Sequence, residues 1–331
     1  MADGPIPASY SAAAGAGADG EPTVHVLVGA SWLDNIGHEL ADSVWPAFGT
    51  LLETRMLALD NQVVIVGEPL KSFGSHAALS LRPPVSLASV PPQTCFPWAV
   101  AGNGGRGLPS PPLPSLFSWA AMQSFVFQRY GLPHGALGAA APAGEAASDD
   151  EGQLRIVVRL KEGRHTFTNY DELVAGLRRC YPAAAVSLVS PDKLSFEEEL
   201  RLLARAAVYI TPGGGGSFTA PFLSRNAVLV LGAACWPAAA AACQAPTPEG
   251  ACCVQIERHV WSNWQYLHTE YLTYLGPTSA MVRDPADGLE TLRWNYPASL
   301  PALVELINRG LFLSRGEEAL AAAFSSSCTA P

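Results

Sequence analysis

Four consecutive glycines, Gly213–Gly216, constrain this sequence more than any other stretch. They follow a short apolar run at 208–211 that predicts a buried strand, and Ser217 after them opens a predicted helix. Glycines let a ligand come close to the backbone, and the first N–H groups of a helix lack partners within it. The stretch therefore predicts a phosphate or diphosphate site, with Gly213, Gly214, Gly215, Gly216 and Ser217 as its contacts.

This loop does not match the common phosphate-binding motifs. No lysine follows Gly216, as a P-loop requires, and Phe218 stands where a dinucleotide-binding fingerprint read from Gly213 needs its last glycine. A plain flexible turn is the other interpretation. Successive glycines lose much conformational entropy on folding, so they destabilise a folded chain. This cost favours the interpretation in which the glycines have a function.

The composition excludes several classes of protein. The 331 residues carry a formal net charge of −9 without a basic run, so we expect no binding to nucleic acid. No run of about 18 apolar residues is present, so the sequence shows no membrane span. The first 22 residues are rich in Ala, Gly, Ser and Pro and lack the features of a signal peptide, so a disordered tail is expected.

The seven cysteines leave the redox compartment open. They are scattered and form no CxxC pair, which argues against zinc ribbons and thioredoxin-like motifs. Free, partly buried thiols are one interpretation. One or two disulfides of a lumenal protein are the other, and the spacing does not decide between them.

The second half of the chain alternates between apolar strands and amphipathic helices. Such alternation predicts a parallel sheet with crossover helices, in which ligands bind outside the carboxyl ends of the strands. Strands are predicted at 154–160, 186–189, 208–211 and 227–232, and helices at 170–179, 196–205 and 218–223.

The first half shows a similar pattern, and the two halves are separated by a segment rich in Ala, Gly and Pro. We expect a tail at 1–22, an α/β domain at 23–133, a linker at 134–153 and a second α/β domain at 154–325. In the first domain, strands are predicted at 23–29, 61–67 and 94–101 and helices at 35–56, with a break at Pro46, and at 116–130.

Two groups of polar residues are candidates for chemistry. Arg159 ends the strand at 154–160 and Arg164 follows five residues later, so their guanidinium groups could bind a diphosphate at the same sheet edge as the glycine loop. His38 and Asp42 are four residues apart near the start of a helix, on one face, and could supply a general base. Solvated surface residues and ordinary helix capping are the alternatives. No metal site is predicted, because no Asp-x-Asp follows a strand.

With these residues assembled, the chain resembles glycosyltransferase family 61, which includes plant xylosyl- and arabinosyltransferases and EGF-domain O-GlcNAc transferases. Three segments carry the resemblance: Asn35-Ile-Gly-His38 with Asp42, the stretch from Arg159 to Leu173, and the stretch from Ser195 to Leu231 with its glycine loop. Two departures are a glycine in place of the usual loop histidine and Leu231-Gly-Ala in place of a glutamate after the last strand.

The resemblance implies a GT-B-like fold, with two Rossmann-like domains whose parallel sheets face a cleft. It implies an inverting, metal-independent transfer of a pentose or GlcNAc from a UDP-sugar to a hydroxyl of a glycan or glycoprotein, with no cofactor beyond the donor. It also implies a location in the Golgi or ER lumen. The missing loop histidine leaves a catalytically inactive binding or scaffold protein as an alternative, and a nucleotide-using enzyme of another class, such as an oxidoreductase, is a further one.

Overall fold

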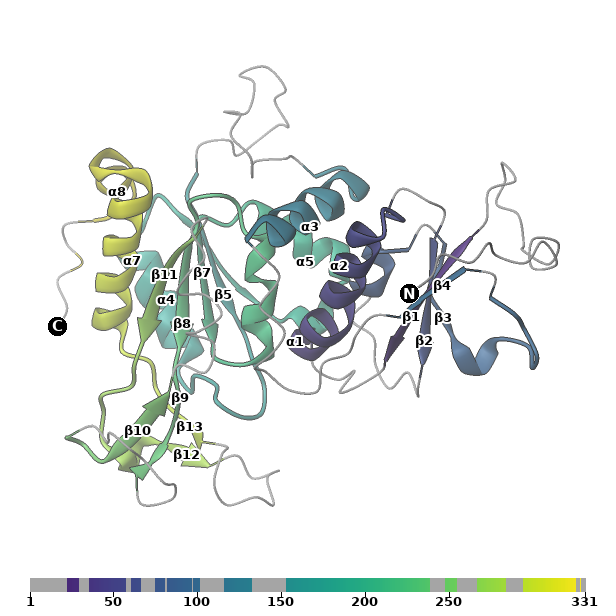
Figure 1. Ribbon diagram of the computed structural model, residues 1–331. Coiled ribbons are helices and arrows are strands. Elements are labelled where there is room, and N and C mark those ends of the chain that lie inside the picture. The colour runs from purple at the N-terminus through teal and green to yellow at the C-terminus, as the bar shows by residue number, and fades with distance from the viewer. Residues whose placement is uncertain are drawn as a thin grey trace. The chain divides into compact units, whose positions relative to one another are not determined.

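The computed structural model describes residues 23–29, 36–57, 61–66, 75–80, 82–96, 98–101, 116–132, 153–238, 248–254, 267–283, 294–325 and 328. The chain divides into two compact units, with the boundary between residues 130 and 131. Each unit contains a parallel sheet and helices, so the predicted α/β class is confirmed for both (Figure 1). The predicted tail 1–22 and linker 134–153 lie outside the described residues, apart from residue 153. The arrangement of the two sheets around a cleft stays a prediction.

The first unit contains a four-stranded parallel sheet in the order β3-β2-β1-β4. β1 pairs with β2 along its whole length and with β4 on its other side. The predicted strands at 23–29 and 61–67 are confirmed, whereas β4 begins at Trp98 instead of residue 94, and the two-residue β3 was not predicted. The strands are β1 (Val24–Gly29), β2 (Asn61–Val66), β3 (Val85–Ser86) and β4 (Trp98–Ala101).

The predicted helix at 35–56 is divided in the structure. It begins as α1 (Ile36–His38), continues as the π-helix η2 (Glu39–Val44) and ends as α2 (Trp45–Glu53). Pro46 lies in the first turn of α2, where its missing N–H and fixed φ are tolerated. Val44 and Trp45 before it have helical φ and ψ, so the predicted break is a change from π- to α-helical hydrogen bonding within one continuous helical segment. The other helices of this unit are η3 (Ser75–Ala78), η4 (Leu87–Ser89) and α3 (Leu116–Arg129).

The second unit contains a five-stranded parallel sheet in the order β11-β8-β7-β5-β6. Every residue of β7 and β8 is buried, as expected for strands covered on both faces, and such strands consist of continuous apolar runs. The four strands predicted in this half of the chain are present in this sheet. β11, which was not predicted, forms one edge of it. The strands are β5 (Arg155–Arg159), β6 (Ala185–Val189), β7 (Val208–Pro212), β8 (Val228–Gly232) and β11 (His268–Leu272).

Helices cover both faces of this sheet (Figure 1). The connection from β5 to β6 and the connection from β6 back to β7 run in opposite directions across the sheet. Because crossovers between parallel strands are right-handed, α4 and α5 lie on opposite faces, and α7 packs beside α4. The helices are α4 (Tyr170–Cys180), η5 (Pro191–Lys193), α5 (Phe196–Ala204), η6 (Gly215–Phe222), η8 (Thr278–Ala280), α7 (Leu300–Arg315) and α8 (Glu317–Ala323).

Disulfide bonds connect peripheral segments of this unit. Cys180 at the end of α4 is bonded to Cys328, and Cys235 is bonded to Cys253 across the antiparallel pair β9 (Ala234–Pro237) and β10 (Ala251–Val254). Cys252 is also disulfide-bonded. The structure thus favours the disulfide interpretation over free thiols. A second small antiparallel pair is formed by β12 (Val282–Arg283) and β13 (Trp294–Asn295).

Candidate functional site

The glycine loop Gly213–Gly216 lies at the topological switch point of the second sheet. β6 lies on one side of β5 and β7 on the other, and all three strands are parallel. Crossovers diverge at such a point and leave a crevice outside the carboxyl ends of the two central strands, where ligands bind in sheets of this kind. Arg159 is the last residue of β5, and the glycine loop begins immediately after β7. The structure therefore brings these two predicted elements to the same place.

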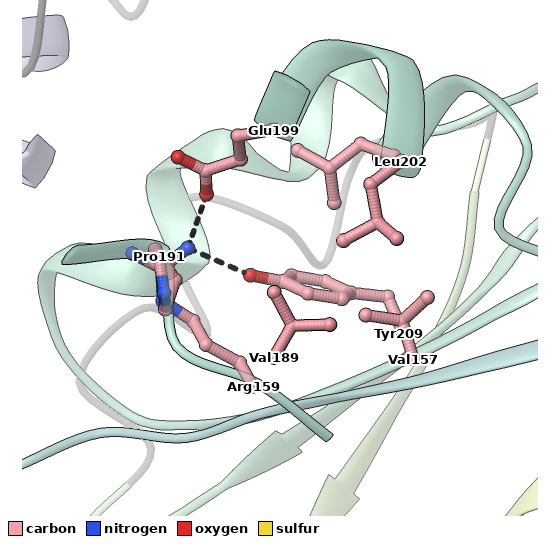
Figure 2. Close-up of a pocket in the computed structure, with 8 residues that line it drawn as sticks. Val157, Arg159, Val189, Pro191, Glu199, Leu202 and Tyr209 are labelled. Atoms are coloured by element: carbon pink, nitrogen blue, oxygen red, sulfur yellow. Dashed lines mark hydrogen bonds and ion pairs between the residues drawn. The ribbon is translucent and has the colours of Figure 1, made fainter. Parts of the chain in front are cut away.

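Arg159 belongs to a buried polar cluster with Glu199 and Tyr209 (Figure 2). Its Nη1 donates hydrogen bonds to Glu199 Oε1 and, at 3.1 Å, to the Tyr209 hydroxyl. The side chains of Arg159 and Glu199 are 7% and 6% exposed. Burial lowers the pKa of Arg159, but Tyr209 and Glu199 outweigh burial and raise it above the ordinary value, so the guanidinium is charged. Burial raises the pKa of Tyr209, whose hydroxyl therefore stays protonated at neutral pH.

Glu199 enters this cluster from the apolar face of α5. Ser195 caps the helix: its hydroxyl accepts from Glu198 N at 3.3 Å, and the Glu198 carboxylate accepts from Ser195 N at 2.7 Å. Phe196, Leu200 and Leu203 are buried on the same face as Glu199. A carboxylate at an apolar helix position requires a buried partner, and this signal was available in the sequence although the prediction did not use it.

A small pocket lies between the cluster and the strands below it (Figure 2). The Glu199 and Tyr209 side chains converge on Arg159 at one side, and aliphatic side chains form the rest of the wall. The full lining consists of Val157, Arg159, Val189, Pro191, Glu199, Leu202, Leu203 and Tyr209.

Two of the glycines have identifiable structural reasons. Gly214 has φ +111°, a backbone conformation that residues with a Cβ atom rarely adopt. A Cβ atom on Gly216 would lie 2.5 Å from Nε of Arg159, so only glycine allows the backbone to rest on the guanidinium. Thr219 Oγ1 also donates to Gly216 O at 2.9 Å. The glycine loop is therefore packed directly on the Arg159 cluster.

The helix after the glycine loop differs from the prediction. It is a 3₁₀ helix, η6, that begins at Gly215 instead of Ser217 and contains Pro221. Ser217 is fully buried, and both its N–H and its hydroxyl donate to Gly214 O, at 3.0 and 2.9 Å. In this conformation both donors of Ser217 are used within the loop, and its contact with a ligand stays a prediction.

The segment after β5 contains one cation that touches the glycine loop and one that does not. Arg164 is exposed, and none of the described contacts of the loop involves it. Lys161, which was not predicted, donates from Nζ to Gly213 O at 2.5 Å. Its position two residues beyond Arg159 was a usable signal, because alternate residues of an extended segment face the same side.

The predicted catalytic pair lies in the first unit. His38 is half-buried at the junction of α1 and η2, and Asp42 lies within η2. Glu39 between them is fully buried: it accepts from Ser75 N at 3.0 Å and lies 3.4 Å from Nδ1 of His76. Burial lowers the pKa of His76 although Glu39 opposes this, so the imidazole is neutral at pH 7. Glu39 therefore connects η2 to η3 through its buried carboxylate. Separately, π-helical segments such as η2 are frequent at functional sites.

Comparison with known proteins identifies a family for the segment that holds this site. Residues 103–230 match the family model of glycosyltransferase 61. This part of the chain is similar to glycosyltransferase family 61. The match confirms the predicted family and supports a glycosyltransferase, and it includes β5, β7 and the glycine loop. No curated protein matches the sequence.

Two solved structures show a weak likeness. They are the iron-containing dodecameric glycosyltransferase TibC from enterotoxigenic E. coli, and the same heptosyltransferase in complex with ADP-D-beta-D-heptose. The identities are 11% and 12%, and the TM-scores are 0.31 and 0.32. The matches cover 64% and 63% of this chain but only 58% and 57% of the TibC chains, so this chain spans less than two thirds of their length.

Two features are absent from the residues that the structure describes. No helix in those ranges is long and apolar enough to cross a membrane. In the same ranges, no three His, Cys, Asp or Glu side chains gather as ligands of a metal ion.

Proposed function

We propose that the protein transfers a sugar from a UDP-sugar to a hydroxyl group of a glycan or glycoprotein, with inversion at the anomeric carbon. The observation that carries the proposal is the position of Arg159 and the glycine loop at the switch point, within the segment that matches the family model of glycosyltransferase 61. A nucleotide diphosphate is the ligand that suits a charged guanidinium beside a backbone without Cβ atoms. Either a pentose or GlcNAc is the transferred sugar.

Arg159 is positioned to hold the donor. Both of its hydrogen bonds to Glu199 and Tyr209 leave from Nη1, and its Nε is the atom closest to the place where a Cβ of Gly216 would lie. The cluster thus anchors one end of the guanidinium while the Nε side faces the glycine loop. Preorganised charge of this kind stabilises a leaving group without reorganisation during the reaction.

In the proposed reaction, the acceptor oxygen attacks the anomeric carbon from the side opposite the diphosphate. The bond between that carbon and the diphosphate oxygen breaks, and the nucleoside diphosphate leaves with the electron pair. His38 or Asp42 takes the proton of the acceptor hydroxyl as general base. Arg159, with Arg164 as a further proposed contact, neutralises the departing diphosphate without a metal ion or an added cofactor.

The disulfides support a location in the lumen of the ER or Golgi. Cys180–Cys328 and Cys235–Cys253 are structural bonds of the second unit. Such bonds persist in oxidising compartments and are rare in the cytosol. This location would also give the protein access to glycan or glycoprotein acceptors.

The proposal is tested by thermal denaturation with UDP-xylose, UDP-arabinose and UDP-GlcNAc, with uridine as a phosphate-free control. A true donor at 100 times its Kd stabilises by about 2.7 kcal/mol. For a unit of this size that corresponds to an increase in Tm of about 5–11 °C. Asp42→Ala or His38→Ala should keep this shift and lose transfer to acceptors. If no sugar nucleotide raises Tm, the proposal is wrong; a shift without transfer to any acceptor would favour the inactive binding protein.

A further inference from the structure

The Tyr209 hydroxyl lies between the Arg159 guanidinium and the glycine loop. Tyr209 belongs to β7, and its side chain is buried. The hydroxyl accepts a hydrogen bond from Nη1 of Arg159 at 3.1 Å (Figure 2). On its other side it lies 3.3 Å from Oγ1 of Thr219 and 3.4 Å from the carbonyl oxygen of Gly216. One hydroxyl group therefore contacts both parts of the candidate site.

These contacts form a hydrogen-bond chain with one direction. A guanidinium nitrogen can only donate, so the Tyr209 oxygen accepts from Arg159 and donates its own proton onward. Thr219 has one hydroxyl proton, which it donates to Gly216 O at 2.9 Å, so it accepts from Tyr209. Burial raises the pKa of Tyr209, and the proton in the middle of the chain therefore stays in place at neutral pH. We call Arg159 Nη1, Tyr209 OH, Thr219 Oγ1 and Gly216 O the hydroxyl chain.

The hydroxyl chain fixes where the guanidinium lies relative to the glycine loop. Nη1 of Arg159 is shared between Glu199 of α5 and Tyr209 of β7. Without the Tyr209 hydroxyl, the carboxylate alone would hold Nη1 and draw the guanidinium toward α5. On the loop side, a Cβ atom on Gly216 would lie 2.5 Å from Nε of Arg159, so the loop backbone is already in close contact with the guanidinium. A small shift of either partner would change this contact.

We propose that Tyr209 and Thr219 are positioning residues for the diphosphate of the sugar nucleotide; this inference rests on the proposed function. Their hydroxyls hold the guanidinium of Arg159 and the glycine loop at one separation, so that a single diphosphate contacts both. Both side chains are buried, so they act through Arg159 and the loop instead of touching the ligand. Binding groups need to be held within about 0.5 Å of the productive geometry, which is the purpose of such a chain.

Tyr181 provides a matched control for a purely structural role. It is fully buried in the same unit, and its hydroxyl donates to Asn308 Oδ1 at 2.8 Å. It follows α4, which leads from β5 to β6, so it lies at the amino ends of these parallel strands, opposite to the glycine loop. Tyr181→Phe therefore removes an equivalent buried hydroxyl at a distance from the candidate site.

The first test measures the Kd of UDP for the wild type, Tyr209→Phe and Tyr181→Phe by calorimetry. Phenylalanine keeps the ring, so each variant loses only one hydroxyl. Tyr209→Phe should weaken UDP binding by about fivefold or more, because a hydrogen bond to the charged guanidinium is lost and the separation is no longer fixed. Tyr181→Phe should bind UDP within twofold of the wild type.

The second test uses Thr219, and it also covers the case in which Tyr209→Phe does not fold. Thr219→Val keeps the shape of the side chain without its hydroxyl and should weaken UDP binding as Tyr209→Phe does. Thr219→Ser keeps the hydroxyl and should restore binding to within twofold of the wild type. The double variant Tyr209→Phe/Thr219→Val should weaken binding by less than the product of the two single effects, because both substitutions interrupt the same chain.

Several results would overturn the inference, and they separate it from the proposed function. If the wild type binds UDP and Tyr209→Phe binds it within twofold, the hydroxyl has no role in binding and the proposed function stands. The same holds if Tyr181→Phe weakens binding equally, if the valine and serine variants of Thr219 bind alike, or if the single effects multiply in the double variant. If the wild type binds neither UDP nor any UDP-sugar, the proposed function and the inference are both wrong.

Discussion

The buried pair of Arg159 and Glu199 predicts a large loss of stability on Glu199→Ala. The two side chains are 7% and 6% exposed, and the guanidinium is charged. Removing the carboxylate leaves an uncompensated charge in the interior, which costs about 3–5 kcal/mol. For a unit of this size the loss corresponds to a decrease in Tm of about 6–20 °C.

The same helix supplies a matched control. Glu197 pairs with Arg201 at 2.6 Å, one helical turn further on, but these side chains are 46% and 49% exposed. Solvent screening limits an exposed pair at this spacing to about 0.3–0.5 kcal/mol. Glu197→Ala therefore removes the same kind of residue from the same helix. We expect it to lower the free energy of unfolding by about a tenth as much as Glu199→Ala does.

Equilibrium urea unfolding at pH 7 measures both variants, with the disulfides intact and with fluorescence and circular dichroism as coincident probes. Arg159→Met/Glu199→Leu should recover much of the loss, because replacing both charges with apolar groups removes the unpaired ion. If Glu199→Ala lowers the free energy of unfolding no more than Glu197→Ala does, Arg159 is not a buried charge that depends on Glu199. The account of the cluster as the anchor of the guanidinium would then be wrong.

Two further predictions concern the periphery of the second unit. Replacing the Cys180–Cys328 pair with serines should cost more free energy of unfolding than replacing Cys235–Cys253, by urea denaturation, because the sequence separations are 148 and 18; chain entropy gives about 5 and about 3 kcal/mol. Burial raises the pKa of Glu270, but hydrogen bonds from Arg309 and His268 outweigh it and lower the pKa overall. This stabilisation is complete above the unfolded carboxyl value of about 4.3 and is lost as pH falls through the lower folded value. Arg309→Met should therefore reduce stability at pH 7, by about 1 kcal/mol or less because Arg309 is half-exposed, and this loss should shrink as the pH falls below about 4.3, as followed by Tm against pH.

The parallel sheet of the second unit could be predicted from the sequence because its central strands are buried on both faces. Such strands appear as uninterrupted apolar runs, and β7 and β8 begin and end within one residue of the prediction. The π-helix η2 could not be predicted in this way. An apolar stripe constrains which residues are buried, and it does not distinguish the hydrogen-bond pattern of an α-helix from that of a π-helix.

The candidate site was predicted in part. Arg159 and the glycine loop were placed at one sheet edge because parallel strands bring their carboxyl ends together. The partners of Arg159 were not predicted, since Glu199 and Tyr209 come from α5 and β7, 40 and 50 residues away in sequence. Which charged residue reaches a given cation depends on the packing of a helix against a sheet, and a local sequence pattern contains no record of that packing.

The glycines that indicated a ligand site are also required by the protein itself. Gly214 leaves space for Lys161, and Gly216 leaves space for Arg159, so the loop needs both residues even without a bound molecule. A run of glycines therefore does not by itself distinguish a phosphate loop from a tight packing contact. The distinction comes from what the glycines accommodate. Here they accommodate two cations at the switch point of a parallel sheet, and packing alone would be served as well by apolar side chains at positions 159 and 161. Because Glu199 already pairs with Arg159, the case for an anionic ligand rests on the position of the loop at the switch point together with these cations.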